Sequence, residues 1–469
     1  MDLTKGQVTG AAKLGTWMKL KPTALSSRIF ILTGKAGTGK TTLVKFVFKE
    51  LLGSSKRFGP LTPFSFPPVM GVCMSHKAKH VLSGSIPECL TYAGYFGHTI
   101  SYKQDGTTAF IKRKASPWSK FPHEIPIPFV IHDECSMYNE QMLKEVLNTT
   151  HPRTKIIFMG DPGQLPPVDA DGYDIDSPIF GLNIGEASRH HLTERVRQTD
   201  ENPIIPLSDI IYGETFGAQR FKPMYQFAAT DQHNSAGEGF EKIFYSQLVD
   251  KFAEVSEENI LDSKVIAYRK FQVANINSQI RQRLFGDVSA RFVPGDVVVF
   301  NNTLVNDPQR GNEADYTFYN SDEYKIKAVR EGKYLDIPVY VLDVHIPQGE
   351  GHHLERVKNP FFRVVHEKGL KAFSDECDRL HTIASAEKDK TERRKKFAEY
   401  HSYKAAFGDV SYAYALTCYK AQGSTYKHIF VDMNDIRTTG PLSKKRKLQS
   451  WYTAVTRASH NVYLIGQDA

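Results

Sequence analysis

The chain has 469 residues with a formal net charge of +8, and 41% of its residues are hydrophobic. This length predicts roughly two to four domains with ample cores. The modest positive charge fits a nucleic-acid partner or an ordinary solvated surface. No apolar run approaches the roughly 18 residues of a membrane span, and the N-terminus lacks the apolar core of a secretory signal. The five cysteines are scattered without a CxxC pair, which argues against a zinc site or disulfide framework and favours the cytoplasm.

The first predicted element is a strand, a glycine-rich loop and a helix, in that order. The apolar run 29–32 precedes the segment GKAGTGKTT at 34–42, and an amphipathic run follows at 43–52. Glycines let backbone N–H groups turn inward around a phosphate chain, and the helix points its positive end at the same place. Lys40 would then reach the β- and γ-phosphates, and Thr41 would bind Mg²⁺. The segment predicts a binding site for a nucleoside triphosphate.

Residues 98–114 predict a β-hairpin. The pair Asp105-Gly106 lies between two runs of β-forming residues, and Asp-Gly in that setting is a strong hairpin signal. Phe110, in the second run, is either an exposed apolar platform or an aromatic residue buried under the hairpin.

Two acidic residues follow the next predicted strand, the apolar run 129–132. Asp133 and Glu134 would stand at the carboxyl end of this buried strand. Alone, such a pair would be interpreted as solvated surface. Behind a phosphate loop, adjacent carboxylates suit nucleotide hydrolysis, because Asp133 can hold Mg²⁺ while Glu134 activates the attacking water.

A further buried strand is predicted at 155–159, and the loop that follows it carries Gly160-Asp161-Pro162-Gly163-Gln164. The neutral amide of Gln164 can bond both a γ-phosphate and a water molecule. It can thereby report the state of the nucleotide to the rest of the protein.

The remainder of the chain predicts a second α/β unit that carries an insertion. One strand of this unit is expected at 264–268, and the unit reappears at 411–431. Between them lie a stretch rich in β-formers, at about 290–365, and a charged helical stretch at 367–403. We therefore expect the second unit to contain an inserted small β-barrel and a helical projection.

Six stretches of this chain occur in the order found in one protein family. They are Gly34–Thr42, Asp133-Glu134, Gly160–Gln164, Leu192–Arg197, Tyr414–Thr425 and Trp451–Ala458. With them the chain resembles the superfamily 1 helicases, and looks most like the 1B branch that includes the RecD-like enzymes. Its size and its opening residues, Leu3–Gln7, are most similar to the Dda helicases of tailed bacteriophages. The resemblance covers nearly the whole chain.

The resemblance implies an α/β fold with two RecA-like parallel-sheet domains. The first would comprise residues 1–200, with a β-hairpin pin inserted at about 97–115. The second would comprise 201–289 and 406–469, and the inserted β-barrel and helical arm would occupy 290–405. The pin of such enzymes splits the duplex.

The resemblance also assigns roles to individual residues. Gln7 would read the adenine, and Arg197 and Arg457 would cross the cleft between the two domains to neutralise phosphoryl charge; either arginine could instead form a surface salt bridge. Catalytic roles fall to Lys40, Glu134, Gln164, Arg197 and Arg457, and Mg²⁺ would bind Thr41 and Asp133. Nucleotide contacts fall to Gln7, Gly37, Thr38, Gly39, Lys40, Thr41, Thr42 and Gly423, and DNA contacts to Ser75, His76, Lys77, Thr91, Phe110, Thr417 and Tyr419.

Two positions depart from the family pattern. Tyr419 stands where a histidine is usual, and Thr91-Tyr92-Ala93 replaces Thr-Ile-His. A tyrosine can still stack on a base or donate a hydrogen bond. Two basic or polar stretches also have a second interpretation, since Ser75 could simply cap a helix, and the run 444–447 is usually a solvated loop rather than a DNA contact.

The resemblance implies an ATP-dependent DNA helicase that uses ATP and Mg²⁺ and moves 5′ to 3′. Its partners would be single-stranded DNA, forked duplex DNA and a single-strand-binding or replication protein. It would act as a monomer in replication or recombination, in the host cytoplasm if it is phage-encoded. The alternatives are an RNA helicase, a translocase that strips proteins from DNA, and a RecD-like motor subunit of a nuclease complex.

Overall fold

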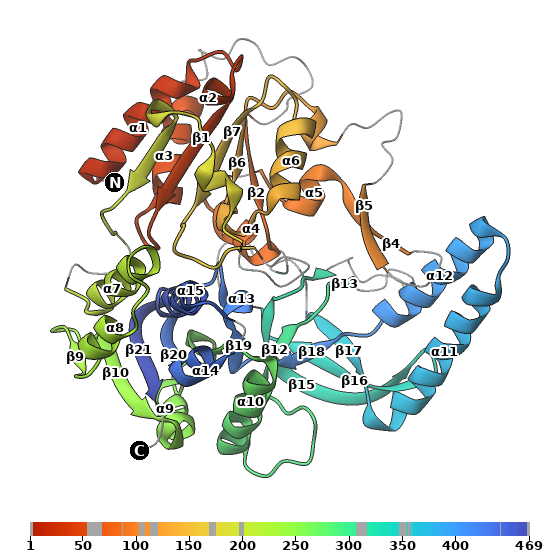
Figure 1. Ribbon diagram of the computed structural model, residues 1–469. Coiled ribbons are helices and arrows are strands. Elements are labelled where there is room, and N and C mark those ends of the chain that lie inside the picture. The colour runs from red at the N-terminus through yellow and green to blue at the C-terminus, as the bar shows by residue number, and fades with distance from the viewer. Residues whose placement is uncertain are drawn as a thin grey trace. The chain divides into compact units, whose positions relative to one another are not determined.

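The computed structural model describes residues 3–53, 68–86, 88–102, 108–112, 121–167, 175–196, 201–305, 317–346, 354, 357, 359–440 and 442–466. The chain forms two compact units (Figure 1). The first unit contains Met1–Tyr95, Ser116–Leu284 and Ala415–Ala469, and the second contains Phe96–Ala115 and Phe285–Tyr414. Both units are therefore assembled from separate stretches of the sequence.

The first sheet of the first unit is entirely parallel, with the strand order β3-β2-β6-β7-β1-β8. Every residue of β2, β6 and β7 is buried, as expected of a sheet covered on both faces. The predicted strands at 29–32, 129–132 and 155–159 are confirmed. The strands are β1 Ile29–Gly34, β2 Val69–Cys73, β3 Cys89–Thr91, β6 Phe129–His132, β7 Lys155–Gly160 and β8 Arg189–Leu192; the helices are α1 Lys5–Met18, α2 Leu25–Arg28, α3 Lys40–Gly53, α4 His76–Ser83, α5 Tyr92–Phe96 and α6 Glu140–Thr149.

The second sheet of the first unit has the order β19-β11-β20-β21-β10-β9 and is parallel except for the edge strand β9. Its predicted strand at 264–268 is observed one residue earlier, as β11. The strands are β9 Gln232–His233, β10 Gly239–Phe244, β11 Ser263–Ala267, β19 Ala415–Thr417, β20 Tyr426–Asp432 and β21 Ala458–Gly466. The helices are α7 Ile204–Phe216, α8 Lys222–Phe227, α9 Leu248–Val255, α10 Lys270–Phe285, α13 Cys418–Ala421, α14 Met433–Thr438 and α15 Lys444–Val455. The predicted fold class, with two RecA-like parallel-sheet domains, is confirmed.

The second unit is built on an antiparallel sheet with the order β17-β16-β15-β12-β18. Alternating buried side chains of these strands pack into one aromatic-rich core, where Phe300 stacks on Phe318 with ring centroids 4.9 Å apart. The Gly408 N–H donates to the carbonyl of Arg363 at 2.7 Å, which links the segment before β18 to the opposite edge strand. The strands are β12 Val297–Phe300, β13 Leu304–Val305, β14 Thr317–Phe318, β15 Glu323–Tyr334, β16 Ile337–Val344, β17 Phe361–Val365 and β18 Val410–Tyr412.

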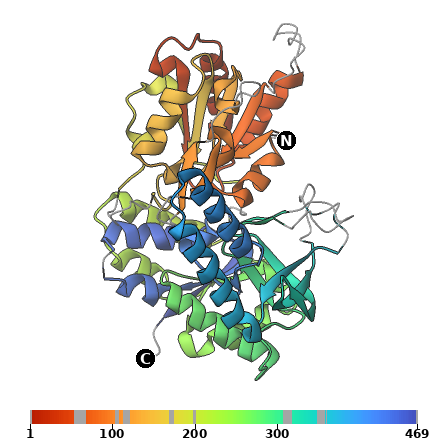
Figure 2. The same cartoon turned by 90° about the vertical axis from the view of Figure 1, so that its right-hand side faces the viewer.

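The second unit also contains a helical arm and a hairpin. The arm is the pair α11 Leu370–Ala386 and α12 Lys390–Ala405, which lie side by side (Figure 2). The hairpin pairs β4 His98–Tyr102 with β5 Thr108–Lys112, and Phe110 is opposite Ile100. The two strands predicted there are confirmed, whereas Asp105-Gly106 lies outside the described residues. Helix α12 lies beside β4, so the arm and the hairpin are neighbours within this unit.

Short 3-10 helices complete the described structure at Pro122–Glu124, Cys135–Met137, Pro178–Gly181, Glu186–Ser188, Tyr245–Gln247, Ile260–Asp262 and Glu367–Gly369. In the part of the chain that the structure describes, no helix is long and apolar enough to cross a bilayer.

Candidate active site

The predicted phosphate loop joins β1 to α3 and is already shaped for an anion. Gly37 and Gly39 adopt φ values of 79° and 72°, a region that only glycine enters without strain. The Lys40 ammonium donates to the carbonyl of Gly34 at 2.8 Å and to that of Lys35 at 3.1 Å. These bonds hold Lys40 across the loop, while Thr41 and Thr42 lie half-buried in the first turn of α3.

Gln7 packs directly against this loop. Its side chain is buried, and its amide N–H donates to the carbonyls of Thr38 at 3.2 Å and Gly39 at 3.4 Å. A Cβ added to Gly39 would lie 2.3 Å from the same amide nitrogen, so a glycine is required for this close approach. Thr4 and Gln7 form the capping box of α1, which fixes Gln7 at its place beside the nucleotide loop.

Asp133 and Glu134 follow β6, on the strand end where the sequence predicts them. Glu134 adopts left-handed backbone angles, with φ 52° and ψ 40°. A non-glycine residue in this region is uncommon and marks a strained position. The Glu134 N–H donates to the Asp133 carboxylate at 2.9 Å. Burial and the nearby Glu134 carboxylate raise the pKa of Asp133, and the Lys40 ammonium opposes this shift, so the lysine and the acids share one electrostatic environment.

Gln164 lies in the turn that follows β7. Its backbone N–H donates to the Asp161 carbonyl at 3.1 Å, and the Asp161 carboxylate accepts the Gly163 N–H at 2.9 Å. The side-chain amide oxygen of Gln164 is buried and has no hydrogen-bond partner among the described residues. An unsatisfied buried acceptor is costly, and a water molecule held beside a bound nucleotide would satisfy it by donating a hydrogen bond. The loop, the acids and this amide therefore fit ATP and Mg²⁺.

Helix α15 packs on the second sheet and also contacts the turn 161–167, which follows a strand of the first sheet. The Thr453 hydroxyl accepts the Leu165 N–H at 3.2 Å, and the Gln449 amide donates to the Pro162 carbonyl at 3.4 Å. Gln422, after α13, donates to the Ser136 hydroxyl at 3.4 Å. Ser136 follows a strand of the first sheet and Gln422 follows a strand and short helix of the second, so the candidate site is lined from both.

The basic run 444–447 is not the solvated loop that the sequence suggests. It forms the first turn of α15, which Ser443 caps by accepting the Arg446 N–H. The Arg446 side chain is only 4% exposed and donates to the carbonyls of Pro166 and Pro167, each at 3.3 Å. The physical reason for the error is that an arginine can be buried when its fixed fork of donors meets carbonyls.

Of the two predicted cleft arginines, only Arg457 is described. It is 3% exposed and donates to the Thr453 carbonyl at 3.0 Å, the Ser424 carbonyl at 3.2 Å and the Thr456 hydroxyl at 3.3 Å. Thr453 lies in α15, Thr456 follows that helix, and Ser424 follows α13. Arg197 lies outside the described residues, but the N–H of the preceding residue, Val196, donates to the Gly37 carbonyl at 2.8 Å.

The predicted DNA-contact residues, except Phe110, lie at or just after the carboxyl ends of strands. Ser75 caps α4 after β2, with its hydroxyl accepting the Ala78 N–H at 3.1 Å. Thr417 caps α13 after β19 in the same manner, accepting the Lys420 N–H at 3.3 Å. His76 and Lys77 begin α4, Thr91 ends β3, Tyr419 lies in α13 with its ring 6.5 Å from that of Tyr268, Gly423 has φ 80°, and Phe110 is in β5.

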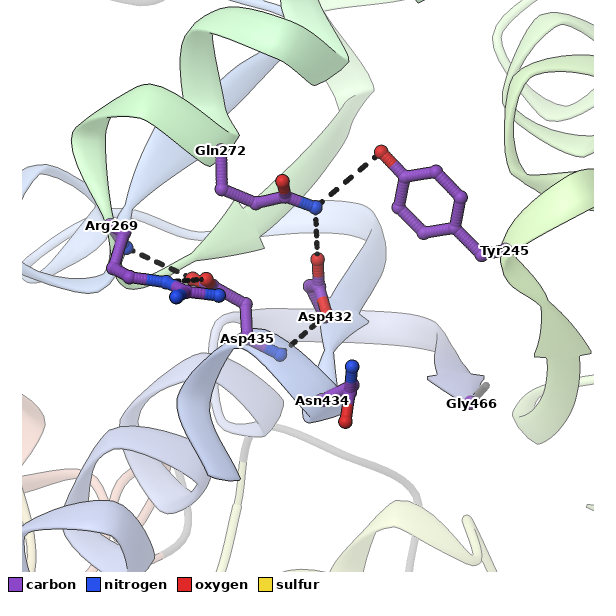
Figure 3. A pocket seen from close by; sticks show the side chains of 7 residues that line it. All are labelled: Tyr245, Arg269, Gln272, Asp432, Asn434, Asp435 and Gly466. Atoms are coloured by element: carbon purple, nitrogen blue, oxygen red, sulfur yellow. Dashed lines mark hydrogen bonds and ion pairs between the residues drawn. The ribbon is translucent and has the colours of Figure 1, made fainter. Parts of the chain in front are cut away.

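A polar pocket of about 400 Å³ lies at the carboxyl end of the second sheet, and the sequence does not predict it (Figure 3). Asp435 is buried and accepts the backbone N–H groups of Tyr268 at 2.7 Å and Arg269 at 2.9 Å. Asp432 accepts from the Gln272 amide and from the Asp435 N–H, each at 2.8 Å. The pocket contains two buried carboxylates but only one guanidinium, so its negative charge disfavours a phosphate. The hydrogen bonds of these carboxylates instead fix the starts of α10 and α14. The acids that follow β20 were the one signal that could have revealed this network.

Comparisons with known proteins match the stretches of the chain that carry these motifs. An AAA domain model matches residues 19–215, and the model of the UvrD-like helicase C-terminal domain matches residues 412–465. The chain is 24% identical to the ATP-dependent DNA helicase dda of Enterobacteria phage T4, over 99% of each protein. It is 23% identical to the uncharacterized protein R530 of Acanthamoeba polyphaga mimivirus, over 93% of this chain and 94% of that protein.

Among solved structures, the Pif1 helicase from Bacteroides in complex with ADP-AlF3 and ssDNA aligns with 16% identity and a TM-score of 0.48, over 99% of this chain and 92% of that one. The two domain models match the chain in the order of its motifs, and the similarity to dda extends over its full length. The recognition made from the sequence is thus confirmed as a resemblance, because the chain is similar over its full length to the phage DNA helicase dda.

Proposed function

We propose that this chain is an ATP-dependent DNA helicase that moves 5′ to 3′ along single-stranded DNA and separates duplex DNA. The proposal of ATP-driven movement rests on one observation. A single hydrolysis site is lined by residues of two parallel-sheet domains. The loop, the acids and Gln164 come from the first sheet, and α15 and Gln422 come from the second. DNA as the substrate is supported by the full-length similarity to the phage helicase.

The residues of the first sheet have distinct chemical roles in this proposal. Lys40 holds the β- and γ-phosphates, and the backbone of Gly37 to Gly39 surrounds them. The Glu134 carboxylate takes one proton from the attacking water. The buried amide oxygen of Gln164 orients this water by accepting a hydrogen bond from its other O–H group. Thr41 and Asp133 are the residues that would hold Mg²⁺, which neutralises charge on the phosphates.

The arginines act through closure of the two domains. The Arg457 guanidinium now donates to the carbonyls of Thr453 and Ser424, and we infer that it exchanges part of this bonding for the phosphoryl group. Arg197 supplies a second charge, since its neighbour Val196 is bonded to the phosphate loop. Such charges stabilise the developing negative charge of phosphoryl transfer.

The single strand is proposed to cross the carboxyl ends of both sheets. Ser75, His76, Lys77 and Thr91 would contact it on the first sheet, and Thr417 and Tyr419 on the second. Hydroxyl and ammonium groups suit phosphate contacts, and an aromatic ring suits base stacking. Action as a monomer, a single-strand-binding or replication protein as partner, and work in the cytoplasm remain predictions.

A fork assay tests this function and its direction. A duplex with a 5′ single-stranded tail should be unwound in the presence of ATP, and a duplex with only a 3′ tail should not, because the motor must load on the tail and run toward the junction. The measurement is strand displacement on both forks, with an RNA duplex carrying the same tails as the control. Preference for the 3′ tail would contradict the direction, and equal unwinding of RNA would favour an RNA helicase.

The hairpin β4–β5 is proposed to divide the two strands, with Phe110 as the platform for the last base pair. Phe110→Ala should slow unwinding by about tenfold while ATP hydrolysis stimulated by single-stranded DNA stays near normal, because lost base stacking is worth about 1–3 kcal/mol. Both rates are measured on one preparation. The control is Phe244→Ala, which removes an exposed aromatic residue from the second sheet. Unchanged unwinding would exclude Phe110 as the platform, and a joint fall of both rates and the melting temperature would indicate a buried structural residue.

A further inference from the structure

Tyr452, in the last turn of α15, makes two hydrogen bonds that none of the assigned motif roles explains. Its hydroxyl donates to the Asp161 carboxylate at 2.8 Å and accepts the N–H of Ala36 at 3.1 Å. Ala36 belongs to the phosphate loop, and Asp161 begins the turn that carries Gln164. The Tyr452 hydroxyl, on a helix of the second sheet, therefore bonds two loops of the first sheet, both of which belong to the proposed hydrolysis site.

The ring of Tyr452 is fixed as closely as its hydroxyl. The side chain is fully buried, and its ring packs edge-on against Tyr212 with centroids 5.3 Å apart. A Cβ added to Gly163 would lie 3.2 Å from the Tyr452 ring and 2.5 Å from that of Tyr212. The turn before Gln164 thus needs a glycine because the two rings approach it so closely.

The Asp161 carboxylate needs this hydroxyl as a hydrogen-bond donor to one of its two oxygens. Asp161 is 1% exposed, and its other oxygen accepts the Gly163 N–H at 2.9 Å. A buried carboxylate oxygen without a donor is strongly unfavourable. Burial and the nearby Asp161 charge raise the pKa of Tyr452, so the hydroxyl keeps its proton and remains a donor throughout the neutral range.

Hydrogen bonds at the end of α15 also link Tyr452 to the predicted cleft arginine, Arg457. The Tyr452 carbonyl accepts the Thr456 hydroxyl at 2.8 Å, and the Arg457 guanidinium donates to the Thr456 hydroxyl and to the carbonyl of Thr453. Tyr452 and Arg457 therefore move together as parts of one helix end. A shift of α15 relative to the phosphate loop must break or strain the bonds of the Tyr452 hydroxyl.

We propose that Tyr452 is a positioning residue for ATP hydrolysis, whose hydroxyl holds the phosphate loop and the Gln164 turn in register with the helix that carries Arg457. The inference rests on the proposed ATPase function and names a residue that this function did not include. We assign Tyr452 no contact with nucleotide or water. It acts through Ala36 and Asp161, and errors of about 1 Å in such positioning can cost about 10²-fold in rate.

The test is Tyr452→Phe, which keeps the buried ring and removes only the hydroxyl. We expect kcat for DNA-stimulated ATP hydrolysis to fall at least about tenfold while KM for ATP changes less than about threefold, since the lost interaction organises the reaction rather than binding. Tyr212→Phe is the matched control, because its hydroxyl lies in the same ring cluster and has no hydrogen bond among the described contacts. An unchanged kcat for Tyr452→Phe, or an equal loss in Tyr212→Phe, would overturn the proposal.

A second variant separates positioning from folding. Combining Asp161→Asn with Tyr452→Phe removes the buried charge that the lost hydroxyl would strand, and should return the melting temperature toward that of the wild type. A low kcat in this stable double variant supports positioning, whereas a restored kcat shows that Tyr452 only stabilised the fold and overturns the inference. Wild-type protein without any DNA-stimulated hydrolysis would instead refute the proposed function itself.

Discussion

Lys40→Ala abolishes ATP hydrolysis: we expect the DNA-stimulated rate to fall on the order of 10³-fold or more, the scale seen when a charge that stabilises a phosphoryl transition state is removed. The Lys40 ammonium spans the phosphate loop through the carbonyls of Gly34 and Lys35. Alanine therefore removes both the charge on the phosphates and a brace of the loop. Unwinding of a 5′-tailed fork must disappear with hydrolysis.

The control for Lys40→Ala is a lysine on the same helix. Lys45 lies in α3, and its ammonium donates to the Gly84 carbonyl at 3.0 Å, away from the phosphate loop. Lys45→Ala should hydrolyse ATP at a rate within about twofold of wild type, as expected of an exposed substitution. Equal activity of both variants in a steady-state phosphate-release assay would refute the assignment of the loop.

Glu134→Gln should separate binding from turnover. The amide keeps the size of the side chain but cannot take a proton from water, so hydrolysis should fall about 10²- to 10⁴-fold, the typical contribution of a general base. Binding of ATP should persist, because Lys40 and the loop glycines are untouched. The left-handed backbone at Glu134 is a position that glutamine can occupy at similar strain.

The measurements for Glu134→Gln are ATP binding by equilibrium titration and single-turnover hydrolysis on the same preparation. Glu140→Gln is the control, because Glu140 is an exposed acid at the start of the neighbouring helix α6 and pairs there with Lys144. Near-normal turnover in Glu134→Gln would contradict its role as the base. Loss of ATP binding together with turnover would mean that Glu134 shapes the site rather than acts in the chemistry.

The sequence predicts those parts of the site whose residues lie close together along the chain. A strand, a glycine loop and a helix must place Lys40 and Thr41 together, because covalent neighbours cannot move far apart. Asp133 and Glu134 follow a run of buried apolar residues, so their position at a strand end is also a local property. The same logic allows Ser75 to be interpreted as a helix cap, and its hydroxyl does cap α4.

What the sequence could not predict depends on contacts between distant segments. Tyr452 is hundreds of residues from Ala36 along the chain, and nothing local to either shows that one hydroxyl joins them. Arg446 looks like part of a solvated basic run until the carbonyls of Pro166 and Pro167 are seen around it. The left-handed conformation of Glu134 is likewise imposed by its surroundings, since glutamate has no preference for it.

The strand order of the second sheet has a consequence for how this chain folds. Strand β11 pairs with β19, which follows it only after the whole of 285–414. A direct search for that contact would be slow, because closing so long a loop costs entropy before any pairing rewards it. The inserted stretch 285–414 shortens the search, since its first and last strands, β12 and β18, pair with each other. Once that sheet has formed, its two ends emerge side by side, and the nascent polypeptide needs to close only a short gap before β19 docks.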